Sequence, residues 1–214
     1  MFSSKGNFNF DKDAEDAFVF SEDYKDFGVE CWEFCNNTSN AVNFTGPIPD
    51  AWEDDFEPRY VPESANYDRI EELLEVKELA ANNKATMTDL QREELATLQA
   101  SCIANFKQMH DWVLSTATFD TIPDPNNENK TIRVPVSEEE ARVRLDKFKR
   151  EFTQHFNMHY CCIYYVFTLF ALMTDQRAKN MFLTRWTTKD INGVETTKWY
   201  PYFYDNDKSY GINN

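Results

Sequence analysis

The sequence is poor in glycine, proline and basic residues. Its 214 residues include 5 Gly, 8 Pro and 22 Lys or Arg, against 37 Asp or Glu. So little Gly and Pro excludes collagen-like and low-complexity chains, and the five glycines form neither a Gly-x-Gly-x-x-Gly nor a Gly-x-x-x-x-Gly-Lys phosphate loop. The formal charge of -15 argues against nucleic acid as a partner, because phosphate-backbone binders depend on clustered Lys and Arg.

Long hydrophobic runs are also missing. The longest apolar stretch, 160–173, is interrupted by Thr168, and a bilayer span needs about 20 apolar residues. No basic-then-apolar leader opens the chain, so we expect no secretory signal. Five cysteines, an odd number, then predict reduced thiols in a protein made in the cytoplasm.

The hydrophobic content is nevertheless high enough for a folded core. Hydrophobic residues make up 42% of the chain and aromatic residues 15%, which excludes disorder throughout. The acidic excess is concentrated in residues 1–60, which hold 14 Asp or Glu and 4 Lys or Arg. We therefore predict a β-rich acidic segment over 1–60 and a helical part with a C-terminal hairpin over 61–214, either as separate parts or as one domain.

Strand signals occur at both ends of the chain. Short runs of β-forming residues, separated by Asn, Ser and Gly, predict strands over 8–10, 29–34 and 42–44. Two further strand-like segments, 181–186 and 198–204, are joined by a loop containing Asn192-Gly193, which favours a hairpin.

Helical periodicity dominates the middle of the chain. It predicts helices over 67–81 and 88–115, which we expect to form a helical hairpin, and over 138–154. The last two begin at the capping boxes Thr88/Gln91 and Ser137/Glu140. The segment 121–136, with three prolines, is predicted as a surface loop. Residues 157–174 are apolar nearly all round, which predicts a long, central buried helix and completes an α+β fold.

One polar constellation follows the apolar helix. Asp175 and Asn180 precede the predicted hairpin, and Asp205 and Asp207 follow it. Phosphoryl transfer needs an Asp to orient a hydroxyl and Asn or Asp to hold magnesium. One interpretation is therefore a catalytic Asp175 with Lys179 near phosphate, metal ligands at Asn180, Asp205 and Asp207, and ATP with magnesium as cofactors.

The alternative interpretation is a structural cluster that joins the helix to the hairpin. Its members are Asp175, Arg177, Lys179, Asp205 and Asp207. Cations are favoured at a helix C-terminus, where carbonyl groups are unsatisfied. Because the chain lacks a complete active-site motif, we favour this interpretation, with no catalytic, metal or cofactor site.

Histidine and cysteine offer weaker candidates. His155 and His159 are four residues apart and would share a helical face, but a core or interface pair is favoured over metal ligands because no His-Glu-x-x-His pattern is present. Cys161 lies among apolar residues and is predicted to be a buried, inert thiol. Cys31 and Cys35 would bind metal only if a second ligand pair met them.

The C-terminal motifs resemble the end of the atypical kinase fold of the CotH spore-coat family, whose acidic residues bind metal and nucleotide. The residues that carry this resemblance are Asp175-x-x-x-Lys179-Asn180, Lys198-Trp199-Tyr200-Pro201 and Tyr204-Asp205-x-Asp207-x-x-x-Gly211. The resemblance implies an atypical protein kinase or a degenerate relative of one.

A broader resemblance covers most of the chain. It rests on Phe8-Asn9-Phe10-Asp11-Lys12, Glu33-Phe34-Cys35-Asn36-Asn37-Thr38-Ser39, Trp52-x-x-x-Phe56-Glu57-x-Arg59-Tyr60, Asp111-Trp112-Val113-x-Ser115-Thr116, Arg177-Ala178-Lys179-Asn180-Met181-Phe182-Leu183 and Trp199-Tyr200-Pro201-x-Phe203-Tyr204-Asp205-x-Asp207. These pieces resemble a segment of very large tail structural proteins of tailed bacteriophages, including crAss-like phages.

This second resemblance implies a structural virion protein in the tail or a muzzle-like assembly, made in the host cytoplasm. Its partners would be other virion proteins, with symmetric homo-oligomers expected. It also implies that the natural polypeptide extends beyond Asn214. A third class, a host-side adaptor that binds a basic partner through the acidic N-terminal face, would require salt-sensitive association.

Overall fold

The computed structural model describes residues 30–34, 48, 52, 56–173, 181–189 and 192–203. The fold is α+β with a C-terminal β-hairpin, as predicted. The chain divides into two compact units. We call them the sheet unit, which contains β1, β2, α6, β5 and β6, and the helical unit, which contains η3, α2, α3, α4, β3, β4 and α5 as far as Phe152.

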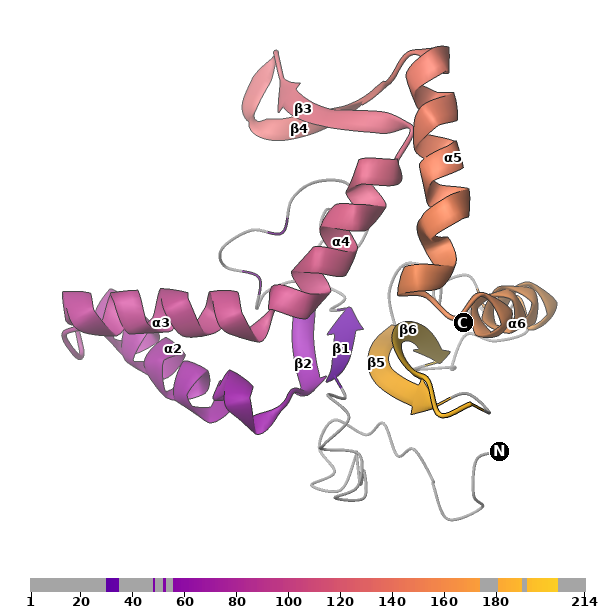
Figure 1. Cartoon of the computed structure of the whole chain (residues 1–214). Helices are drawn as coiled ribbons and strands as arrows, with labels where there is room; N and C mark the ends of the chain where they lie inside the picture. The colour runs from indigo at the N-terminus through magenta and orange to yellow at the C-terminus, as the bar shows by residue number, and fades with distance from the viewer. Residues whose placement is uncertain are drawn as a thin grey trace. The chain divides into compact units, whose positions relative to one another are not determined.

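The sheet unit contains one antiparallel sheet with the strand order β2-β1-β5-β6 (Figure 1). Its strands are β1 (Glu30–Phe34), β2 (Phe56–Tyr60), β5 (Met181–Lys189) and β6 (Glu195–Phe203). The pairing of β1 with β5 joins strands from opposite ends of the chain. The division into units therefore does not follow the predicted boundary at residue 60, because strand pairing over long sequence distances defines it.

The C-terminal hairpin is confirmed, with β5 paired to β6 throughout its length. Gly193 lies in the connection with a φ of 77°, a left-handed conformation that glycine adopts without steric cost. The strand predicted over 29–34 is confirmed as β1, whereas those predicted over 8–10 and 42–44 lie outside the described residues. Strand β2 was not predicted, because its sequence does not alternate between apolar and polar residues.

Aromatic side chains form the core on one face of this sheet. Opposite partners in an antiparallel sheet point to the same side, so the register Cys31↔Tyr60, Cys31↔Thr184 and Thr184↔Tyr200 gathers these residues on one face. Buried Cys31, Phe182, Tyr200 and Tyr202 form the centre of the cluster, with Tyr60, Tyr160 and Trp186 packed against it. This face is the one on which helix α6 lies.

The helical unit begins with η3 (Glu63–Ala65), α2 (Tyr67–Ala81) and α3 (Asp89–Cys102). The predicted helix over 67–81 and the helical hairpin are confirmed, and an Arg69–Glu94 ion pair of 2.9 Å joins the two arms. The Thr88/Gln91 capping box is also confirmed, with both of its hydrogen bonds present.

The single helix predicted over 88–115 is wrong, because the chain breaks it at Ile103. Helix α3 ends there and α4 (Ala104–Thr116) begins, with Ile103 as the shared cap at φ -87° and ψ 0°. A break of one residue leaves the apolar spacing unchanged, so Leu95, Cys102 and Phe106 are all buried although they lie on two helices.

The surface loop predicted over 121–136 is also wrong. This segment forms a hairpin of β3 (Phe119–Asp124) and β4 (Asn127–Pro135), followed by α5 (Glu138–His155). The prolines lie where a strand tolerates them: Pro125 in the turn, Pro135 at the strand end and Pro123 next to an irregularity in the pairing. Asp124 accepts the backbone N–H of Asn126 at 2.8 Å, which closes the turn without glycine.

Helix α6 (Met158–Phe170) is present as predicted, but the prediction that it is buried on all sides is wrong. Only Tyr164 and Thr168 among its residues are buried. The helix packs on the sheet through one side, where the Tyr160 ring lies 5.7 Å from that of Tyr200 and 5.5 Å from that of Tyr202. Among the described residues, no helix is long and apolar enough to cross a membrane.

Helix α6 ends in a left-handed residue that is not glycine. Leu172 has a φ of 54°; its N–H donates to Leu169 O at 3.3 Å, and the N–H of Met173 donates to Thr168 O at 2.9 Å. This pattern is a Schellman motif, which normally places glycine at the left-handed position. A leucine there is strained.

We expect Leu172→Gly to be more stable than Leu172→Ala by about 0.5–1 kcal/mol, because both variants lose the leucine side chain beyond Cβ but only alanine keeps a left-handed strain of about 1–2 kcal/mol. The gain is reduced by the larger unfolded-state entropy of glycine, about 0.5–1 kcal/mol. Urea unfolding of the two variants measures the difference. Equal stabilities would contradict the strain.

Candidate functional site

The residues of the predicted polar constellation lie outside the described part of the chain. They are Asp175, Arg177, Lys179, Asn180, Asp205 and Asp207. The catalytic, magnesium-binding and structural interpretations of these residues therefore stay predictions.

The proposed histidine pair does not share a helix. Helix α5 ends at His155, and α6 begins at Met158, after a bridge between Phe156 and Trp199. The residues therefore do not occupy one helical face, and the spacing argument for a shared site is wrong. Within the described ranges, no three His, Cys, Asp or Glu side chains are grouped so that they could hold a metal ion.

Burial favours the thiol form of two cysteines of the sheet unit, Cys31 and Cys161. Burial raises the pKa of Cys31 to about 12, although Thr184 donates a hydrogen bond to its sulfur at 3.5 Å. Burial raises the pKa of Cys161 to about 11. Because the thiolate is the reactive form, these raised pKa values lower the reactivity of both thiols. Cys161, which was predicted to be buried, is only partly buried, and Cys35 lies outside the described residues.

The most unusual feature of the described chain is the outer face of α6. Successive residues of an α-helix are turned by about 100°, so Tyr160, Tyr164 and Thr168 lie on the side that packs on the sheet. Most of the remaining circumference carries exposed residues, and Phe167, seven residues after Tyr160, is exposed next to the packed side. We call the following set the α6 face: His159, Cys162, Ile163, Val166, Phe167 and Phe170.

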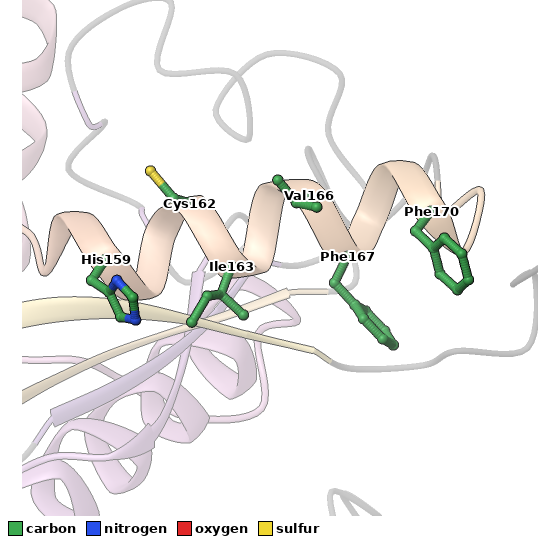
Figure 2. Close-up of a pocket in the computed structure, with 6 residues that line it drawn as sticks. All are labelled: His159, Cys162, Ile163, Val166, Phe167 and Phe170. Carbon is green, nitrogen blue, oxygen red and sulfur yellow. The ribbon is translucent and has the colours of Figure 1, made fainter.

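These six side chains line a shallow hollow of about 440 Å³ (Figure 2). Phe170 is 74% exposed, Val166 62% and Ile163 53%. Tyr165 and Leu169 extend the exposed apolar surface along one edge. Large exposed side chains are ordinary when scattered, but a contiguous set along a whole helix is typical of an interaction surface.

The α6 face is also free of ionised carboxylates, ammonium and guanidinium groups. Residues 152–174 contain no Asp, Glu, Lys or Arg, although the chain as a whole carries a charge of -15. Depletion of charge together with an excess of aromatic residues characterises the core of protein interfaces. The face can therefore bind the apolar surface of another protein, and it offers few polar groups to orient a small polar substrate.

Strand β1 carries a second feature that sequence reasoning missed. Glu30, which is 1% exposed, accepts hydrogen bonds from Arg185 Nη1 at 3.4 Å and from Trp32 Nε1 at 3.5 Å. Glu33 pairs with Arg59, whose Nε donates to Oε2 at 2.6 Å. Buried carboxylates need such partners, so both glutamates are explained as structural groups of the sheet.

Comparison of the chain with family models, curated proteins and solved structures finds no match.

Proposed function

We propose that this protein is a structural component of a bacteriophage virion, positioned in the tail and acting through protein–protein contacts. The observation that carries the proposal is the α6 face: a helix without charged residues, fixed to a sheet by one side, that presents Ile163, Val166, Phe167 and Phe170 to the outside. Such a face supports association with another protein, and the tail-protein resemblance supports the virion as the place of that association.

The charge distribution supports the same function class. The segment that forms α6 and its ends, residues 152–174, contains no Asp, Glu, Lys or Arg, whereas the whole chain carries a formal charge of -15. A neutral, apolar surface on an otherwise acidic chain can associate without large like-charge repulsion, while the remaining charge keeps the free protein soluble.

Mass spectrometry of purified phage particles tests the proposal. We expect peptides of this chain at a fixed, symmetry-related copy number relative to a known tail protein. Particles that lack these peptides would refute the virion assignment. Calorimetric binding of ATP with magnesium, abolished by Asp207→Ala, would instead favour the CotH-like kinase.

A further inference from the structure

We infer that the partner that covers the α6 face is a second copy of this chain, packed as an antiparallel helix pair about a two-fold axis. The inference deepens the proposed function and rests on it for its biological setting. It is carried by the spacing, the area and the charge of this face.

The spacing of the exposed residues matches a helix-pairing seam. His159, Ile163, Val166 and Phe170 follow one another at intervals of four, three and four residues. This is the alternation with which apolar side chains of two helices interlock. A self-complementary seam is what a two-fold interface requires, because the same patch serves both subunits.

The area is sufficient for a specific pair. With about 150–250 Å² for a large aromatic side chain and somewhat less for aliphatic ones, the exposed fractions of Ile163, Val166, Phe167, Leu169 and Phe170 amount to roughly 500 Å² per copy. Two copies would bury about 1,000 Å², the size at which a specific interface is expected.

The charge of the face favours a second copy as well. Two chains of charge -15 repel one another wherever acidic surfaces meet, but α6 contains no Asp, Glu, Lys or Arg. Antiparallel packing also places the positive end of each helix dipole beside the negative end of the other. In this arrangement Ile163 faces Val166 of the second copy, and His159 faces its Phe170.

Leu172 gives an independent indication that the C-terminal end of α6 belongs to the interface. Its left-handed backbone, with a φ of 54°, is unfavourable for leucine, and its side chain is 56% exposed. The residue therefore gains little from burial within the isolated chain, while glycine would relieve the strain. Residues that break a local rule in this way are concentrated at functional surfaces.

Sedimentation velocity of the full chain over a concentration series tests the inference. We expect the wild-type chain to form dimers and both Val166→Glu and Phe170→Glu to weaken the dimer at least tenfold. Leu90→Glu is the matched control, because Leu90 is a 79% exposed apolar residue on α3, and this variant should dimerise like the wild type. Both α6 variants should remain folded as monomers, which their far-UV circular dichroism spectra and melting temperatures would show.

Orientation is tested by cysteine cross-linking. In chains whose native Cys161 and Cys162 are replaced by serine, we expect a mixture of Ile163→Cys and Val166→Cys variants to form a mixed disulfide under mild oxidation faster than either variant alone, because only the antiparallel pair brings these positions together. Faster cross-linking within one variant alone would refute the antiparallel arrangement.

A monomeric wild-type chain would overturn the inference, as would α6 variants that dimerise as strongly as the Leu90→Glu control. A monomer whose melting temperature falls in Val166→Glu would show that another segment of the same chain covers the face. These results are independent of the particle analysis: dimers without the chain in particles would refute the virion role only, whereas particles containing a strictly monomeric chain would refute this pairing only.

Discussion

Replacing Arg59 by methionine is expected to lower the free energy of unfolding by about 3–5 kcal/mol, the cost of removing one partner of a buried ion pair. The Arg59 guanidinium contacts Glu33 on the neighbouring strand, with the two side chains 15% and 12% exposed. Methionine preserves most of the length of the arginine stem, so the loss reports on the charge. Chemical denaturation followed by circular dichroism measures it.

The position of Arg59 explains why this pair exists. Cys31 pairs with Tyr60 and Trp32 pairs with Pro58, so Arg59 is the extra residue of a β-bulge in β2. A bulge redirects a side chain out of the regular alternation. Here it directs the guanidinium towards a carboxylate of β1.

A double-mutant cycle separates the charge from the packing. If Glu33→Gln is combined with Arg59→Met, we expect the double variant to be more stable than the sum of the single losses predicts, because no carboxylate is then left without its guanidinium. Additive losses would show that Arg59 stabilises the sheet through its stem rather than through Glu33.

Local patterns were sufficient to predict the elements that depend on local interactions. The helix over 67–81, the Thr88/Gln91 cap and the β5–β6 hairpin each have their signals within a few residues of sequence. The break at Ile103 and the β3–β4 hairpin were missed. The apolar periodicity of residues 88–115 fits one continuous helix or two, and the three prolines of residues 121–136 fit a loop or a hairpin. In each case tertiary context decided between the two structures.

The burial of α6 was wrong for a different reason. A helix that is apolar on all sides must be enclosed, but the enclosing surface need not come from the same chain. Tyr164 and Thr168 are buried, whereas Val166 and Phe170 are exposed. The composition of a domain core and of an interface core is similar. The hydrophobicity of α6 alone therefore could not distinguish burial within its own chain from burial against another protein.

The buried ion pairs could not be predicted from the sequence because register decides them. Glu30 and Arg185 are 155 positions apart and become cross-strand partners only through the pairing of β1 with β5. A shift by one residue would have turned every side chain of β1 to the other face. Only a three-dimensional arrangement reveals that these acidic residues belong to the sheet interior rather than to an acidic surface.

The second large effect is expected in the helical unit, where Trp112→Ala should cost about 3–5 kcal/mol. Helix α5 has no fully buried residue, so its attachment to α4 depends on a few contacts. The buried Trp112 ring stacks on Phe148 at 5.6 Å, and its Nε1 donates to Glu151 at 3.1 Å.

Trp112→Phe provides the matched control for that change. Phenylalanine keeps an aromatic ring against Phe148 but loses the hydrogen bond to Glu151, so its cost should be only about 1–2 kcal/mol. Hydrogen exchange followed by mass spectrometry should show that α5 loses protection strongly in Trp112→Ala and weakly in Trp112→Phe. If α5 remained protected in Trp112→Ala, the polar contacts Arg144–Asp120 and Lys147–Ser115, rather than the aromatic stack, would hold this helix in place.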